Sequence, residues 1–370
     1  MKRNTHLSFS DVFESCLLFI AAVEQKLLAF IFLSAHFSIA DLEVAALIYG
    51  IAYNKLRMCQ LLGMNCAKPT DFTFSFTGFA KRGGDTDIHS DGWGLVFYEG
   101  CGIRAFHDSL PASKSPISHL VSNYPCKTLN MISHIRYATS GACLLENVHP
   151  FQREIWGIPF VFAHNGDVPN YSFDKDSLPH IGKQQDCNND GRAHVNYYVP
   201  IGTTDSEAIF CAILNSLRKA FDAPPPLHVL YTYLQNLASD IIKSHASDEC
   251  VIFNFLMSCG EHFLFAFSWP GSRPGSSVWN GLYYVIREYP FHMASLKDCD
   301  MSVDFSKVTT KEDRVAVVAT TPLTTDEAWN EFKKGELLLF YEGTAYSSAK
   351  DCKQLDDNHK EMKQCRKQKM

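Results

Sequence analysis

Cys59 stands directly behind Met58, and this pair carries the clearest chemical potential in the chain. If Met58 is a true start and is removed, Cys59 becomes the first residue and holds a thiol and a free α-amine together. An α-amine titrates at about pH 8, so it can accept the thiol proton directly or through one water. Cys59 is therefore a candidate nucleophile with its own base, and the alternative is an ordinary buried strand cysteine.

Three other positions offer groups that can bind a small ligand. Arg136 ends an apolar run, and its planar guanidinium can hold a carboxylate through two parallel hydrogen bonds. Asp205 opens a helical pattern, where it can accept a hydrogen bond from an ammonium group or simply cap the helix. Asn165-Gly166 follows another apolar run and, taken alone, predicts only a turn. Arg136 and Asp205 together suit a free amino acid.

Several histidines and one aspartate raise the question of a metal site. Their spacing matches no known metal motif, and each lies in a sequence block that has another explanation. We therefore expect no metal and no other cofactor. The residues concerned are His89, Asp91, His134, His149 and His164.

Six sequence blocks follow one another between Cys59 and Phe210. They are CQLLG at 59–63, HSDGWGLVFY at 89–98, HIRYATSG at 134–141, NVHPF at 147–151, FAHNGDV at 162–168 and GTTDSEAIF at 202–210. Together they resemble the class II glutamine amidotransferases. Within that family the chain is most similar to the small single-domain type that includes a subunit of the fungal glutathione-degradation complex. The likeness runs from Met58 to about Ala345.

The resemblance implies a role for each matching residue. Cys59 would attack the side-chain amide carbon of glutamine, and the Asn165 amide and the Gly166 backbone N–H would form the oxyanion hole. Arg136 would bind the substrate carboxylate and Asp205 its α-ammonium group. Tyr137 stands where related proteins often have Trp. Further family pocket positions are Tyr137, Thr139, Ser140 and His149.

Hydrophobic patterning predicts strands early, helices in the middle and strands late. Strand-like runs lie between Cys59 and Ala163 and again between Val251 and Tyr341. Helical spacing begins at Asp205, with Thr204 as the cap, and a second helix begins near Leu227. This order predicts an α+β fold of two stacked antiparallel sheets with helices outside. The resemblance implies the same four-layer α/β/β/α sandwich, the N-terminal nucleophile hydrolase fold.

Composition is that of a globular protein, with 46% hydrophobic and 20% charged residues among 370 and a net charge of -6. No linker divides residues 58–345, so we expect a single amidotransferase domain there. The mild acidity and the lack of a Lys/Arg cluster argue against a nucleic-acid partner. The thirteen cysteines are scattered and odd in number, which fits a reducing compartment, the cytoplasm, with most of them buried.

Three segments are expected to lie outside the core of the domain. Residues 1–57 are apolar, but charged residues interrupt them, so no run reaches the roughly 18 residues of a spanning helix and no membrane is expected. They are a removable leader, a retained helical extension or upstream sequence of the gene model. Lys175 to Tyr198 predicts an exposed insertion loop. Residues 346–370 predict a polar, disordered tail.

Two functions from different classes follow. The first is an enzyme that hydrolyses a γ-glutamyl amide bond, in glutamine or in a γ-glutamyl peptide such as glutathione, through a Cys59 thioester. The second is a non-catalytic interaction subunit, because a retained residue 58 would replace the free amine of Cys59 by a peptide nitrogen. Too few residues follow Tyr341 for an acceptor domain. The chain would therefore release its products or dock a separate partner subunit.

Overall fold

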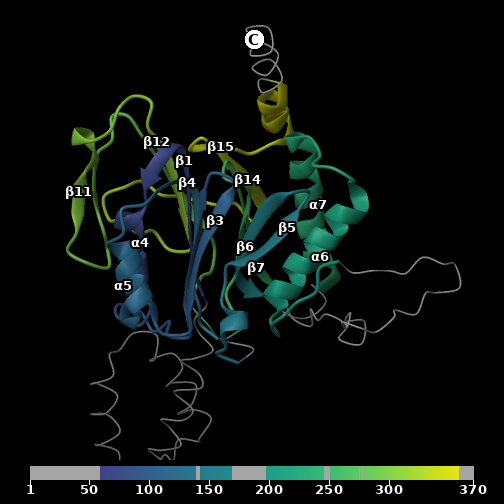
Figure 1. Ribbon diagram of the computed structural model, residues 1–370, viewed down its shortest axis with the longest axis horizontal. Coiled ribbons are helices and arrows are strands. Elements are labelled where there is room, and N and C mark those ends of the chain that lie inside the picture. Colours follow the sequence, from purple (N-terminus) through teal and green to yellow (C-terminus); the bar gives the residue numbers. More distant parts are fainter. Residues whose placement is uncertain are drawn as a thin grey trace, which may run out of the picture. The chain divides into compact units, whose positions relative to one another are not determined.

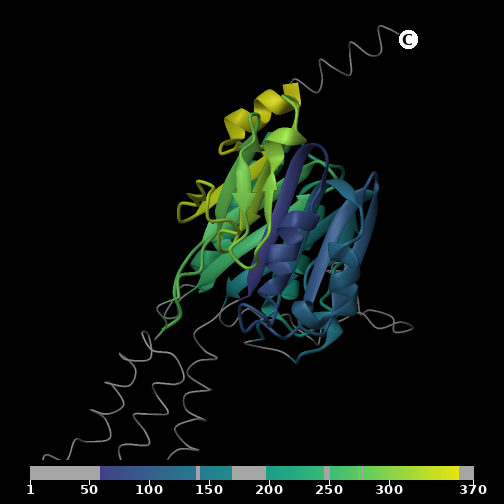
Figure 2. The ribbon, with the colours of Figure 1, turned by 90° about the vertical axis from the view of Figure 1, so that its left-hand side faces the viewer.

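Two large antiparallel sheets, packed face to face, form the centre of the protein (Figure 1). The computed structural model describes residues 59–138, 142–168, 197–245, 251–274, 276 and 278–357. Helices α4 and α5 cover the outer face of one sheet, and α6 and α7 cover the outer face of the other. Figure 2, turned by 90°, shows the purple and blue helices α4 and α5 lying across their sheet. The predicted α/β/β/α sandwich is confirmed.

The two sheets differ in size. The first has the order β13-β9-β12-β1-β4-β2-β3 and the second β15-β14-β8-β7-β6-β5. The strands of the first are β1 Gln60–Asp71, β2 Trp93–Glu99, β3 Gly102–Asp108, β4 Lys127–Ile135, β9 Tyr283–Glu288, β12 Arg314–Ala319 and β13 Asn330–Glu331. Those of the second are β5 Phe151–Ile155, β6 Ile158–Asp167, β7 Ile252–Cys259, β8 Phe263–Trp269, β14 Glu336–Tyr341 and β15 Thr344–Tyr346.

The remaining elements are helices and one small strand pair. The helices are α4 Thr73–Lys81, α5 Pro116–Ser122, α6 Asp205–Ala220 and α7 Leu227–His245, with 3-10 turns η1 Ala112–Lys114, η2 Leu145–Asn147 and η4 Phe305–Lys307. Strands β10 Met293–Ser295 and β11 Ser302–Asp304 pair with each other. Contacts group the described residues, apart from those in 273–278, into one compact unit. Within the described ranges, no helix combines the length and apolarity needed to cross a membrane.

Alternating side chains of the central strands supply three core layers. In β1, Leu62 and Met64 pack beneath α4, whereas Leu61 faces the other sheet, as period two requires. The layer between the sheets uses smaller residues such as Ala163 and Ala266. At Gly63 an added Cβ would lie 2.9 Å from the Leu256 side chain, so glycine permits close approach of the sheets there. This approach brings strands from both sheets to one site.

Helices α4 and α5 were not predicted. The aromatic run from Phe72 to Phe79 forms most of α4, which buries Phe76 and Phe79 in the core under the first sheet. Helix α5 has a Ser115 cap and Pro116 at its first position. Both helices are short, so their apolar period is hard to recognise. The predicted order of early strands, central helices and late strands is confirmed, although short strands such as β5 and β15 were not predicted.

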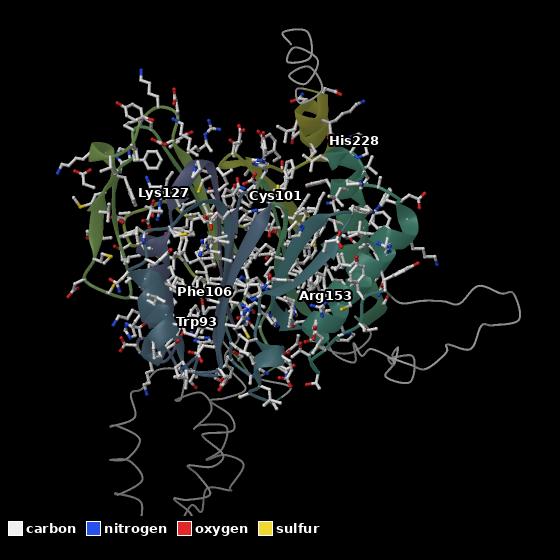
Figure 3. All side chains as sticks on the ribbon, in the orientation of Figure 1. Trp93, Cys101, Phe106, Lys127, Arg153 and His228 are labelled. Atoms are coloured by element: carbon white, nitrogen blue, oxygen red, sulfur yellow. The ribbon has the colours of Figure 1, made fainter. Side chains whose placement is uncertain are left out.

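The packed domain continues past Ala345, the residue at which it was expected to end. Residues 349–357 are helical, and Cys352 and Leu355 are buried against the second sheet and its helices. Asp356 accepts hydrogen bonds from the backbone N–H groups of Leu227 and His228, 2.9 and 3.1 Å away, and so caps α7. Figure 3 labels His228, which lies at the start of α7. Residues 346–357 therefore belong to the packed domain and not to the predicted disordered tail. Residues 1–57, 175–196 and 358–370 lie outside the described ranges.

Candidate active site

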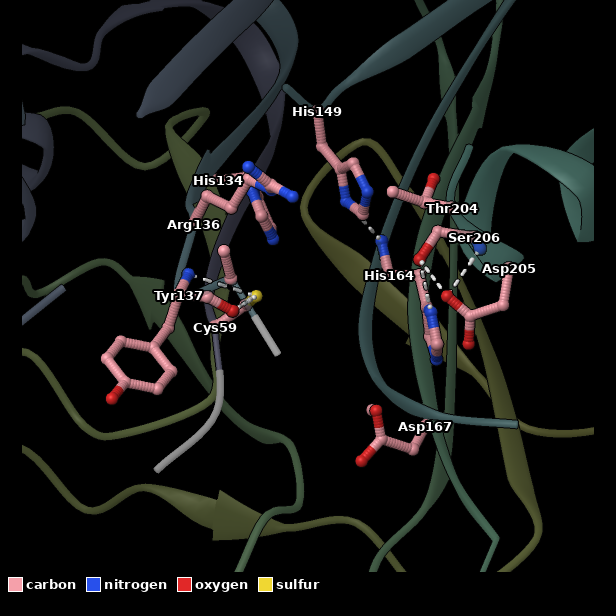
Figure 4. Close-up of a pocket in the computed structure, with 12 residues that line it drawn as sticks. Cys59, His134, Arg136, Tyr137, His149, His164, Asp167, Thr204, Asp205 and Ser206 are labelled. Atoms are coloured by element: carbon pink, nitrogen blue, oxygen red, sulfur yellow. Dashed lines mark hydrogen bonds between the residues drawn. The ribbon is translucent and has the colours of Figure 1, made fainter. Parts of the chain in front are cut away.

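Cys59 lies at the head of β1, a central strand of the first sheet. Gln60 pairs with Ile135 of β4, so the register places Cys59 beside the residues that follow β4. The Tyr137 N–H lies 3.3 Å from Cys59 Sγ and donates to it, and Sγ lies 3.4 Å from the Tyr137 carbonyl oxygen (Figure 4). These contacts fix the position of the thiol next to Arg136 and Tyr137.

A cavity of about 340 Å³, which includes space open to solvent, is lined by Cys59, by residues at the end of β6 and by residues at the start of α6. In Figure 4, Cys59, Arg136 and Tyr137 lie on one side, and His164 and Asp205 lie on the other. The second side is built from the end of β6 and the start of α6. The lining residues are Cys59, His134, Arg136, Tyr137, Ala138, His149, His164, Gly166, Asp167, Thr204, Asp205 and Ser206.

Asp205 is the first residue of α6, and its carboxylate is held by protein donors. Oδ2 accepts from the Val168 N–H at 3.1 Å, and Oδ1 accepts from the Ser206 N–H at 2.8 Å. The Ser206 hydroxyl in turn lies 2.8 Å from Nδ1 of His164. Thr204 caps the helix by accepting from the Glu207 N–H, as predicted. A fixed carboxylate at the cavity wall can bind an ammonium group.

Arg136 is also held in place, and only 3% of its surface is exposed. Its backbone N–H donates to the Gly92 carbonyl at 2.8 Å, and its Nη1 donates to the Ala142 carbonyl at 3.1 Å. The carboxylate of Asp91 accepts from the Ala138 N–H at 2.8 Å. The Asp91-Gly92 turn thus fixes the segment that carries Arg136 and contacts Cys59.

Asn165 and Gly166 continue β6 and pair with β7, so the turn that Asn-Gly predicts locally is not formed. Asn165 is fully buried, and its Nδ2 donates to the Cys59 backbone carbonyl across the two sheets. Its Oδ1 has no hydrogen-bond partner among the described residues. A Cβ at Gly166, where φ is 153°, would lie 1.8 Å from the Ile252 carbonyl oxygen, so only glycine fits. Both residues therefore adjoin Cys59 from the opposite sheet.

Three buried histidines surround the cavity. Burial, followed by the positive charge of Arg136, lowers the pKa of His134 well below its ordinary value. Burial also lowers the pKa of His149 well below that value, and the rings of His134 and His149 lie 4.2 Å apart. Burial lowers the pKa of His164, and the nearby charge of Asp205 opposes the shift. The rings of His134 and His149 are therefore neutral at pH 7 and offer polar atoms without added charge.

Of the described cysteines, Cys59 is the one that lines the cavity. No disulfide joins any of the nine described cysteines, and only four are buried, fewer than expected. Burial raises the pKa of Cys66, Cys211 and Cys352 to about 12, so these thiols stay protonated. Cys101 and Cys143 are exposed. The described residues contain no group of His, Cys, Asp and Glu arranged to hold a metal.

The structure brings most of the predicted site residues together. Asn165 adjoins the cavity through its contact with Cys59, and Thr139 and Ser140 lie outside the described residues. Other lining residues were not predicted as site residues. They belong to the same six sequence blocks, and this membership was the only feature of the sequence that could have indicated them. The predicted residues that line the cavity are Cys59, Arg136, Tyr137, His149, Gly166 and Asp205, and the added ones include His134, His164, Asp167, Thr204 and Ser206.

An α/β/β/α sandwich with a cysteine at the head of a central strand is the arrangement of the N-terminal nucleophile amidotransferases. The chain belongs to the class II glutamine amidotransferases, because a sequence model of that family matches residues 58–366. It is 38% identical to YafJ of Escherichia coli K12, a provisionally assigned glutamine amidotransferase, over 76% of this chain and 97% of that one.

Two further comparisons agree with this family. A Haemophilus influenzae protein with the same provisional assignment is 40% identical over 77% of this chain and 85% of its own. The crystal structure of a glutamine amidotransferase, assigned from its sequence, from Pseudomonas aeruginosa PA01 is 33% identical and superposes with a TM-score of 0.54. It covers 78% of this chain and 100% of that chain. The fold and the family are thus established.

Proposed function

We propose that this protein hydrolyses the γ-glutamyl amide bond of a small substrate with Cys59 as the nucleophile. The observation that carries the proposal is the place of the Cys59 thiol, at the head of β1 in a cavity that also contains Arg136 and Asp205. Arg136 would hold the substrate α-carboxylate and Asp205 its α-ammonium group. A glutamyl group bound in this way would direct its side-chain carbonyl toward the thiol.

The reaction would proceed in two steps. Cys59 Sγ attacks the γ-carbonyl carbon, and its proton passes to the α-amine of the same residue. The Asn165 amide and the Gly166 N–H stabilise the tetrahedral oxyanion. The amine leaves with the proton, and a thioester remains on Cys59. Water then attacks the thioester and gives one proton to the α-amine, glutamate is released, and the Cys59 thiolate takes up that proton.

This mechanism requires a form in which Cys59 is the first residue. If the peptide bond to Met58 is intact, the nitrogen of Cys59 is an amide and cannot accept the thiol proton. We therefore propose that residues 1–58 are absent from the active protein. The matched family region begins at Met58, which supports this assignment.

Glutamine and γ-glutamyl peptides such as glutathione are the proposed substrates. They share the glutamyl group and differ in the leaving amine, which is ammonia for one and a peptide amine for the other. We further propose that the chain releases its products or passes them to a separate partner subunit.

A direct assay tests the proposal. The form that begins at Cys59 is incubated with glutamine or with glutathione, and release of ammonia or of cysteinylglycine is measured together with glutamate. We expect release from at least one substrate without added nucleotide. Absence of glutamate from both substrates would overturn the proposed function.

A further inference from the structure

A row of three buried polar side chains crosses the second sheet beside the cavity. Asn165 of β6 pairs with Asn254 of β7, and Asn254 pairs with Ser268 of β8. None of the three is exposed to solvent. Neighbouring positions on the same faces of these strands, such as Leu256 and Ala266, belong to the apolar layer between the sheets. The polar row thus interrupts a hydrophobic layer at the level of the proposed oxyanion hole.

The hydrogen bonds of this row run in one direction, toward Asn165. The Ser268 hydroxyl donates to Asn254 Oδ1 at 2.7 Å. Asn254 Nδ2 donates to the backbone carbonyl of Asn165 at 3.3 Å and to that of Asn280 at 3.4 Å. Because the backbone carbonyls of Asn165 and Asn280 can only accept, the Asn254 amide nitrogen faces them and its Oδ1 accepts from Ser268. Asn254 therefore holds the Asn165 carbonyl from behind.

We propose that Asn254 is a positioning residue for the oxyanion hole and that Ser268 sets the orientation of its amide. The inference rests on the proposed function of Asn165 and Gly166. The peptide that joins these two residues is planar, so its carbonyl oxygen and its N–H point in opposite directions. A hydrogen bond that fixes the Asn165 carbonyl thereby fixes the direction of the Gly166 N–H.

Glycine at position 166 makes such support necessary. Its backbone has φ of 153°, and no side chain restrains it. Oxyanion stabilisation depends on donors that are already oriented before the charge develops. A small displacement of these donors lowers the rate, whereas Arg136 and Asp205 would still bind the substrate. Loss of Asn254 should therefore reduce kcat much more than it changes KM.

The test compares Asn254→Ala with a matched variant, Asn130→Ala. Asn130 is equally buried, and its Nδ2 also donates to two backbone carbonyls, Gly260 at 3.3 Å and Phe263 at 3.1 Å, but no lining residue of the cavity is among its partners. Both variants are made in the form that begins at Cys59. The readouts are kcat, KM, the melting temperature and the rate of Cys59 alkylation by iodoacetamide.

We expect Asn254→Ala to lower kcat about 10- to 100-fold with KM within about twofold of wild type. Alkylation of Cys59 should be unchanged, because it does not use an oxyanion hole. Asn130→Ala should lower the melting temperature and leave kcat within about twofold of wild type. Equal losses of kcat in the two variants, or a wild-type kcat in Asn254→Ala, would overturn the inference.

Ser268→Ala provides a second variant in case Asn254→Ala does not fold. It removes the hydroxyl that orients the Asn254 amide, and we expect a kcat loss of about 3- to 10-fold with unchanged alkylation. A wild-type kcat in Ser268→Ala would contradict the role of this row. If the unaltered protein releases no glutamate, the proposed function fails and this inference fails with it. An active wild type with unaffected variants overturns this inference alone.

Discussion

The layer between the two sheets has polar residues at both ends, and the two ends are built differently. The end away from the cavity contains Asn65 and Tyr98, and the end at the cavity contains Asn165 and His134. Asn65 follows Cys59 by six residues along β1, which corresponds to about 20 Å at the rise of a strand. One end therefore has polar groups that lie between the sheets away from the cavity, and the other has polar groups that border the cavity.

At the distal end the polar atoms are largely paired within the protein. Asn65 Nδ2 donates to the His262 carbonyl at 2.9 Å, and its Oδ1 accepts from the Gly343 N–H at 3.0 Å. The Tyr98 hydroxyl lies 2.8 Å from the Ser258 hydroxyl. Only Oδ1 of Asn130 lacks a partner among the described residues there. The Asn65 hydrogen bonds join β1 of the first sheet to turns of the second sheet.

At the cavity end several buried polar atoms have no hydrogen-bond partner among the described residues. They are Asn165 Oδ1, both ring nitrogens of His134 and Nε2 of His164, although the His164 backbone lies near the His134 ring and the Ile252 backbone lies near the His164 ring. An unpaired buried polar group costs about 1–3 kcal/mol, so a fold does not retain such groups for stability alone. At the distal end most buried polar atoms join the two sheets through hydrogen bonds, whereas at the cavity end fewer of them have such partners among the described residues.

Replacement of the nucleophile should have the largest effect. We expect Cys59→Ala to lower kcat by about 10⁴-fold or more, because the thioester cannot form, and to leave the melting temperature nearly unchanged. Steady-state glutamate release and circular dichroism measure the two quantities. Cys66→Ala is the control, since Cys66 is buried in the core under α4 and should lose stability but keep kcat. Retained activity in Cys59→Ala would refute the mechanism.

Arg136→Lys should have the next largest effect. A lysine ammonium cannot reproduce the two parallel hydrogen bonds to a carboxylate, so we expect KM to rise about 10- to 100-fold. The matched control is Arg287→Lys. Arg287 does not line the cavity, and its guanidinium makes a two-point ion pair with the Glu327 carboxylate, with nitrogen–oxygen distances of 2.7 and 2.8 Å. That control should lower the melting temperature and leave KM unchanged. An unchanged KM in Arg136→Lys would remove Arg136 from substrate binding.

A substitution at the distal end should lower the stability of the fold and leave the activity nearly unchanged. Asn65→Ala removes two hydrogen bonds that join β1 to turns of the second sheet, and we expect the free energy of unfolding to fall by about 1–3 kcal/mol. Chemical denaturation measures this loss, and kcat should stay within about twofold of wild type. A large loss of kcat would mean that the two ends are not independent.

The buried histidines predict a smaller effect, on how stability depends on pH. Above about pH 6.5 both the folded and the unfolded protein carry His134 uncharged. Below that pH the unfolded chain takes up a proton at His134, whereas the folded protein resists it, so stability falls as the pH falls. His134→Gln should reduce the slope between pH 6.5 and 5 by up to about 1.4 kcal/mol per pH unit. The exposed His262, replaced by Gln, serves as the control, and an equal change in both variants would contradict the prediction.

Much of the fold could be predicted from local pattern. Strand β12, Arg314–Ala319, lies where strand-like runs were expected between Val251 and Tyr341, because both of its faces are buried and its apolar run is continuous. The Thr204 cap was also predicted, because its partner Glu207 lies one turn away. Helix α4 was missed, since nine residues give too short a helical period.

The site was predicted only as far as each residue has a local signal. Cys59 and Arg136 could be proposed from their residue types and sequence blocks. Asn254 could not, because a single Asn in an apolar run resembles any strand position, and its bond to Asn165 depends on the β6 and β7 register. The link from His164 through Ser206 to Asp205 likewise joins segments about 40 residues apart.

The most direct test of the central claim compares two forms of the protein that differ at the amine of Cys59. One begins at Cys59, the other is the full 370-residue chain, and intact-mass measurement verifies each N-terminus. Glutamate release from glutamine and from glutathione is then measured for both. We expect turnover by the first form and none by the second. Equal turnover by the two forms would contradict it.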